Sequence, residues 1–163
     1  MLLLKKTYQN QDFASFQEVA RAFLKEAAVT RKPVTACLAV AGPVKNNYVR
    51  FTNRDSWELD GFKIGEELEI KKVFLINDFE AAGYGLLTLN TEIECVTLQR
   101  AEKQSGAPIA CIGAGTGLGQ CFLTPSGDSD ESGDYRCFPS EGGHAEFAPR
   151  NEVRTIKDIQ FVY

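Results

Sequence analysis

Apolar side chains recur at helical spacing near the start of the chain. Ser15 and Glu18 have the spacing of a capping box, in which two side chains bind the first backbone N–H groups of a helix. The pattern therefore predicts an amphipathic helix that begins at Phe16. Its apolar positions are Phe16, Val19, Ala20, Phe23, Leu24 and Ala27.

Short apolar runs predict strands. Segment 35–41 is almost entirely apolar, which is typical of a strand buried on both faces, and a Gly-Pro turn ends it. Residues 48–52 predict a second strand that pairs with the first. Residues 1–8 and 92–98 predict two further strands, the latter at the outer edge of the fold.

Two polar residues, Asn77 and Asp78, follow the apolar run at 72–76. A short helix is predicted at 61–68, a buried strand at 72–76, and a further helix from Phe79. Asn77 and Asp78 therefore lie where a parallel strand ends and a helix begins, the place where ligands bind in α/β folds. The structural alternative is that Asp78 is only the N-cap of the helix.

Four glycines alternate through segment 113–119, between two apolar runs. Because glycine has no Cβ and tolerates positive φ, the segment predicts a tight hairpin whose backbone approaches a ligand closely. Backbone N–H groups of such a turn bind phosphate, and the Thr116 hydroxyl adds a donor. The spacing fits neither a P-loop nor a dinucleotide fingerprint. A β-hairpin with a glycine bulge is the structural alternative.

Composition excludes several classes of function. The chain has 44% hydrophobic and 25% charged residues and a formal net charge of -4, a balance that disfavours nucleic-acid binding. No run approaches the ~20 apolar residues of a membrane span, so we expect no membrane partner and a cytoplasmic location. Five scattered cysteines indicate buried thiols of a reducing compartment. The acidic stretch 126–134 lacks the closing glutamate of a calcium loop, so we predict no metal site.

The single histidine of the sequence lies in a polar turn that contains two glycines, Glu141-Gly142-Gly143-His144. A histidine in such a turn is either structural or part of a binding loop, and the concentration of polar groups favours a binding loop. A Cys-His hydrolase that uses His144 is disfavoured, because no cysteine has a recognisable activating neighbour.

Three motifs occur in one order and together resemble the bacterial-type glucokinases, ATP-dependent members of the actin-like sugar-kinase superfamily. The resemblance implies an α/β chain with part of the actin-like, or ribonuclease H-like ATPase, fold. Residues 1–103 would form the small α/β lobe without its N-terminal strands, and 104–163 would begin the large lobe. The motifs are Leu75-Ile76-Asn77-Asp78-Phe79, Gly113-Ala114-Gly115-Thr116-Gly117-Leu118-Gly119, and Glu141-Gly142-Gly143-His144 followed by Phe147-Ala148-Pro149.

The resemblance implies a function, the ATP-dependent phosphorylation of glucose to glucose 6-phosphate. Asp78 matches the family's catalytic base, and Asn77, Asp78, Glu141 and His144 match its sugar-binding residues. The glycine turn matches an element that holds the phosphates of ATP, with Mg²⁺ carried on the nucleotide. The complete protein is also expected to form a homodimer. The matching residues of the turn are Gly113, Gly115, Thr116, Gly117 and Gly119.

Several parts of the family's pattern are absent from this sequence, including an Asp-x-Gly-Gly-Thr turn and an adenosine-binding segment. We therefore interpret the chain as an internal piece of a glucokinase, and we expect it to be inactive and poorly soluble alone. The alternative function is a non-catalytic sugar-binding or regulatory remnant of a hexose kinase. Calorimetric titrations with glucose and with ATP would separate the two.

Overall fold

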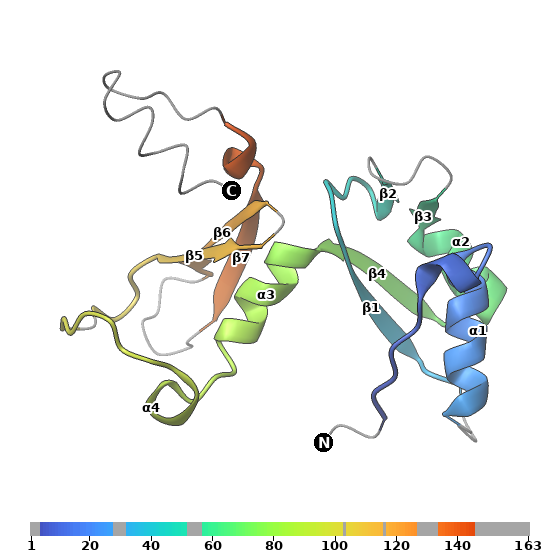
Figure 1. The fold of residues 1–163 in the computed structure, drawn as a ribbon, viewed down its shortest axis with the longest axis horizontal. Helices are drawn as coiled ribbons and strands as arrows, with labels where there is room; N and C mark the ends of the chain where they lie inside the picture. Colours follow the sequence, from blue (N-terminus) through green and yellow to red (C-terminus); the bar gives the residue numbers. More distant parts are fainter. Residues whose placement is uncertain are drawn as a thin grey trace. The chain divides into compact units, whose positions relative to one another are not determined.

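The computed structural model describes residues 4–27, 32–51, 57–102, 104–115, 117–126 and 134–145. The chain divides into two compact units, Met1–Glu102 (unit 1) and Lys103–Tyr163 (unit 2) (Figure 1). Unit 1 contains the 3-10 helix η1 (Asn10–Asp12), α1 (Phe16–Glu26), β1 (Thr35–Val40), β2 (Tyr48–Arg50), β3 (Glu58–Asp60), α2 (Gly61–Leu68), β4 (Lys72–Asn77), α3 (Asp78–Leu86) and α4 (Thr91–Glu94). Unit 2 contains β5 (Ile109–Ala114), β6 (Leu118–Pro125), β7 (Tyr135–Ser140) and the 3-10 helix η2 (Gly142–His144).

Helix α1 begins where the sequence predicts. The Ser15 hydroxyl accepts the Glu18 N–H at 3.3 Å, and the Glu18 carboxylate accepts the Ala14 N–H at 2.9 Å. These bonds satisfy backbone N–H groups that have no partner inside the helix, so the predicted helix start is confirmed. Phe16 and Ala20 pack against the core of unit 1.

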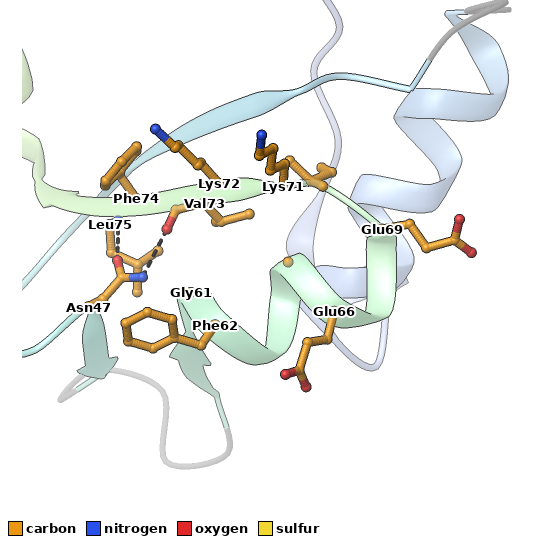
Figure 2. A pocket seen from close by; sticks show the side chains of 12 residues that line it. Asn47, Gly61, Phe62, Glu66, Glu69, Lys71, Lys72, Val73, Phe74 and Leu75 are labelled. Atoms are coloured by element: carbon orange, nitrogen blue, oxygen red, sulfur yellow. Dashed lines mark hydrogen bonds between the residues drawn. The ribbon is translucent and has the colours of Figure 1, made fainter.

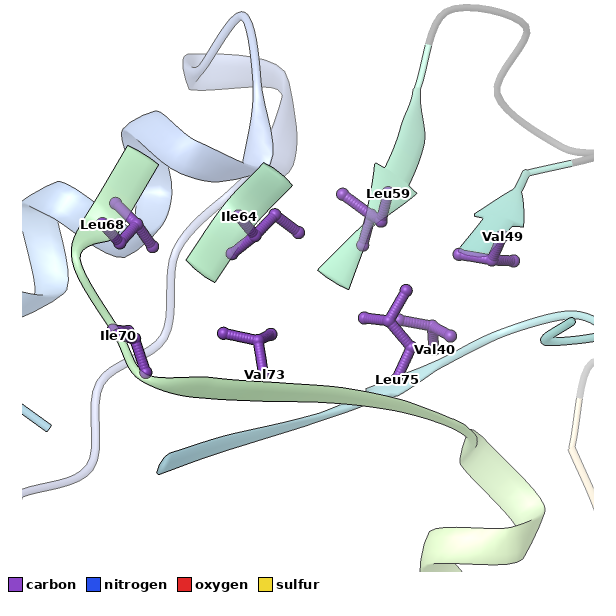
Figure 3. Close-up of a cluster of buried hydrophobic side chains, with 8 residues drawn as sticks. All are labelled: Val40, Val49, Leu59, Ile64, Leu68, Ile70, Val73 and Leu75. Carbon is purple, nitrogen blue, oxygen red and sulfur yellow. The ribbon is translucent and has the colours of Figure 1, made fainter. Parts of the chain in front are cut away.

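The core of unit 1 lies between a parallel strand pair and the elements that cover it. β1 pairs with β4 from Thr35 opposite Lys72 to Val40 opposite Asn77. Figure 3 shows that side chains of α2, β2 and β3 face those of β1 and β4. The eight buried members of this core are Val40, Val49, Leu59, Ile64, Leu68, Ile70, Val73 and Leu75.

The predicted pairing of β2 with β1 is wrong, because β2 pairs with β3. Asn46 and Asn47 have φ values of 51° and 60°, and Lys45 and Tyr48 exchange two backbone hydrogen bonds of 2.9 and 3.0 Å. A two-residue turn with positive φ at both positions has the twist of an antiparallel ribbon. This turn reverses the chain directly before β2.

Two other predicted strands are wrong where the structure describes them. Residues 4–8 have no regular secondary structure, and residues 92–98 contain the end of α4 and irregular backbone. The Asn90 side chain accepts a backbone N–H of α4 at 3.1 Å, and the Glu94 carboxylate accepts the Asn90 N–H at 2.7 Å. These local bonds start a helical turn at the beginning of the segment that was predicted to be a strand.

Burial in β1 also differs from the prediction, because one face of the strand is exposed at Thr35, Cys37 and Ala39. The cysteines also differ from one another in burial. Cys121 and Cys137 are buried, whereas Cys37 and Cys95 are exposed and Cys111 is partly buried. The expectation of buried thiols is therefore confirmed for Cys121 and Cys137 and is wrong for the two exposed cysteines of unit 1.

Unit 2 is an antiparallel sheet in the order β5-β6-β7, and η2 packs against β6. The glycine hairpin is confirmed, with Gly113 opposite Gly119 in its register. Phe122 and Phe138 stack across β6 and β7 with ring centroids 5.2 Å apart. None of the helices in the described ranges of either unit has the length and hydropathy needed to cross a membrane.

Candidate active site

Asp78 lies at the carboxyl edge of the parallel strand pair, where α3 directly follows β4. The Asn77 side chain caps α3, since its Oδ1 accepts the N–H groups of Phe79 and Glu80 at 2.9 and 3.2 Å. The interpretation of Asp78 as the N-cap is therefore wrong. Asp78 is the first helical residue, and its exposed carboxylate accepts the Phe79 N–H at 3.0 Å.

Asn77 itself is almost fully buried, with 7% of its surface exposed. Its Nδ2 donates to the carbonyl oxygen of Gly42 at 3.2 Å. Gly42 follows β1 and has a φ of 114°, a left-handed value that favours glycine. The side chain of Asn77 thus ties the end of β4 to the loop that leaves β1.

Asn47 is a structural residue that the sequence reasoning missed. Its Nδ2 donates to the Val73 carbonyl oxygen and its Oδ1 accepts the Leu75 N–H, both at 2.8 Å (Figure 2). The side-chain amide thus takes the place of a neighbouring strand on the free edge of β4. The signal in the sequence was the Asn-Asn pair, because asparagine tolerates left-handed backbone in turns.

A groove lies between α2 and this edge of β4 (Figure 2). Asn47 and Phe62 are among the residues that line it, and Glu66, Glu69, Lys71 and Lys72 add charged groups of both signs. None of the predicted site residues that the structure describes lines this groove. We therefore place the candidate site at the carboxyl end of β4 and not in the groove.

The glycine turn joins β5 to β6 and leaves open space around its backbone. Gly115 donates its N–H to the Gly117 carbonyl oxygen at 2.9 Å. A Cβ added at Gly115 would have its nearest neighbour 4.0 Å away, and a Cβ added at Gly117 would meet nothing within 4 Å. Thr116, the predicted hydroxyl donor, lies outside the described residues.

Glu141 and His144 lie next to each other around η2. The His144 Nδ1 is 3.3 Å from the Glu141 Oε2, and both side chains are well exposed. The His144 N–H donates to the Glu141 carbonyl oxygen at 3.0 Å, which closes the turn. The continuation of this motif, residues 147–149, lies outside the described residues.

Close packing holds this turn beside the glycine turn. The position of a Cβ at Gly143 lies only 1.8 Å from the carbonyl oxygen of Leu118, the residue that follows Gly117. Two motifs that are distant in sequence are thereby neighbours in unit 2. The structure brings Asn77 and Asp78 together within unit 1, and the glycine turn, Glu141 and His144 together within unit 2.

Comparison with known proteins assigns the chain to a family. A family model described as glucokinase matches residues 2–160. The chain belongs to the glucokinase family. It is 47% identical over 151 residues to the glucokinase of Nostoc sp. (strain PCC 7120) and 45% identical over 155 residues to that of Synechocystis sp. (strain PCC 6803). Each match covers 93% of this chain and 42% of the relative.

A solved structure of a glucokinase from an Antarctic psychrotroph gives the same result at the level of fold. It is 30% identical to this chain with a TM-score of 0.74, and the match covers 94% of this chain and 45% of that chain. The predicted resemblance to glucokinases and the mixed α/β, actin-like sugar-kinase fold are therefore confirmed. The chain spans less than half the length of these relatives.

Proposed function

We propose that the complete protein transfers the terminal phosphoryl group of ATP to glucose and that Asp78 is the general base. The supporting observation is the place of Asp78 at the start of α3. Asn77 caps the helix, and the Asp78 carboxylate, which also accepts the Phe79 N–H at 3.0 Å, is exposed beyond the carboxyl ends of the strands. Phosphorylation of a sugar hydroxyl needs a carboxylate that accepts its proton, and this position suits that role.

Glucose binding is assigned to Asn77, Asp78, Glu141 and His144, the residues that match the family's sugar ligands. The pair in unit 2 supports this assignment through its geometry. A proton on His144 Nδ1 would face the Glu141 carboxylate 3.3 Å away, and Nε2 would then be free to accept a hydrogen bond from a sugar hydroxyl. Sites that pair each hydroxyl in this way reject sugars that lack one.

The phosphates of ATP are assigned to the turn formed by Gly113, Gly115, Thr116, Gly117 and Gly119. The space that a Cβ would fill at Gly115 and Gly117 is open, which suits a close approach of phosphate to the backbone N–H groups. Mg²⁺ bound to the nucleotide would neutralise charge on the transferred group. A cytoplasmic location, a role in glycolysis and a homodimer remain predictions.

A chimera tests this function, because the chain spans 42% of the Nostoc glucokinase that it matches. Residues 2–160 would replace the matching segment of that enzyme, and ADP formation would be followed in a coupled assay. We expect ADP formation with glucose and none with 6-deoxyglucose, which lacks the acceptor hydroxyl. A folded chimera that binds glucose without forming ADP would contradict the proposal. The unmodified relative is the positive control.

A further inference from the structure

We propose that Asn77 is a positioning residue for Asp78, and that this role is its main contribution to the reaction. The inference rests on the proposed function, because it takes Asp78 as the base. Asn77 binds three backbone groups that belong to two segments, the start of α3 and the loop after β1. Its side chain therefore fixes where α3 begins, and with it the first helical residue, Asp78.

The first N–H groups of a helix need acceptors from outside the helix backbone. Asn77 Oδ1 accepts two of them, from Phe79 and Glu80. The Asp78 carboxylate is the competing acceptor, since it already receives the Phe79 N–H at 3.0 Å. Without the cap on α3, the Phe79 N–H would depend on the Asp78 carboxylate alone and would hold it at the helix end, away from a sugar hydroxyl.

Burial and the bond to Gly42 keep the Asn77 amide in this orientation. The side chain is 7% exposed, and Nδ2 donates to the Gly42 carbonyl oxygen at 3.2 Å. Asn77 is also the last residue of the parallel register, opposite Val40. Three of the hydrogen bonds that an amide can form are thus made within the protein, and one N–H of Nδ2 is left for a sugar.

Hydrogen exchange of the 163-residue chain tests the cap directly, without any need for activity. Asn77→Ala should speed exchange of the Glu80 amide, whose N–H Asn77 Oδ1 accepts, by about fivefold, and Asn77→Ser, which can cap, should restore most of the protection. Asn47→Gly is the matched control, since glycine tolerates its φ of 60°. It should speed exchange at Leu75, whose N–H its side chain accepts, and leave Phe79 and Glu80 unchanged.

Kinetics of the chimera then separate positioning from sugar binding. Positioning predicts that Asn77→Ala lowers kcat by about tenfold or more and that Asn77→Ser recovers kcat. KM for glucose should rise in both variants, because neither keeps the Nδ2 N–H that is left for a sugar. The inference is overturned if Asn77→Ala leaves exchange at Glu80 unchanged. It is also overturned if Asn77→Ser restores exchange protection but not kcat. An inactive wild-type chimera would count against the proposed function alone, because the exchange experiment still decides the role of the cap.

Discussion

The two glycine segments of unit 2 contain glycine for different reasons. In η2, a Cβ at Gly143 would lie 1.8 Å from the carbonyl oxygen of Leu118, a backbone atom that cannot rotate away. In the turn, a Cβ at Gly115 would have its nearest neighbour at 4.0 Å, and one at Gly117 would have none within 4 Å. The folded chain therefore requires glycine in η2 but has room for a side chain in the turn. Space for a ligand is the reason that the proposed function gives for the glycines of the turn.

Backbone φ does not explain the glycine at position 115. Positive φ among the described glycines occurs at Gly42 and Gly106, with values of 114° and 69°, and Gly115 is not one of them. The expectation that the turn needs glycine for positive φ is therefore wrong at Gly115. The hairpin prediction was correct, but left-handed backbone at Gly115 is not its physical reason.

The largest predicted effect is that of Gly143→Ala on the stability of unit 2. Contact with the Leu118 backbone should force η2 away from β6. The free energy of unfolding should fall by about 3 kcal/mol, the upper part of the usual range for overpacking. Gly115→Ala is the matched control and should change stability by less than about 0.5 kcal/mol. Hydrogen exchange of the β6 amides under urea measures both. Equal stabilities of the two variants would remove the distinction between the segments.

The next effect concerns the turn and its nucleotide. In the chimera, Gly115→Val should raise KM for ATP by about tenfold, comparable to the loss of one hydrogen bond to a charged group. KM for glucose should change by less than about twofold, because a Cβ in the turn obstructs phosphate and not the sugar. Steady-state kinetics with each substrate varied in turn provide the measurement. Equal increases in both constants would indicate a turn that is only structural.

Gly142→Ala should lower the free energy of unfolding by about 1 kcal/mol, the smallest of the three effects. Its Cβ would approach the Gln120 Oε1 at 2.8 Å and the Ser140 Oγ at 3.1 Å, and both are side-chain ends that can change rotamer. Adding Gln120→Ala should recover part of the loss, which urea unfolding can measure. A cost as large as that of Gly143→Ala would show that backbone contact is not what separates the two glycines.

Local patterns in the sequence were sufficient to predict much of the fold. The capping pair Ser15 and Glu18 marked the start of α1, and the change from an apolar run to Asn77 and Asp78 marked the boundary between β4 and α3. Each of these features depends on side chains within a few residues of the backbone groups that they bind. The sequence could not show which of Asn77 and Asp78 caps α3, because both residue types are good N-caps.

Features that depend on distant contacts could not be predicted in this way. Asn47 binds β4 at Val73 and Leu75, and no local pattern relates these positions. The pairing of β2 with β3 is likewise not marked by a local pattern, and the turn before β2 has positive φ values that follow from two asparagines and not from hydrophobic periodicity. Residues 92–98 were predicted to form a strand, but hydrogen bonds of the Asn90 and Glu94 side chains start a helical turn there.

The central claim, that the Asp78 carboxylate accepts the proton of the sugar hydroxyl, is tested most directly by Asp78→Asn in the chimera. Asparagine preserves size and polarity but cannot act as the base, so kcat should fall by about 10² to 10⁴. Glucose binding, measured by isothermal titration, should remain within a few-fold of wild type. A variant that binds glucose normally and retains more than about a tenth of wild-type turnover would contradict the claim.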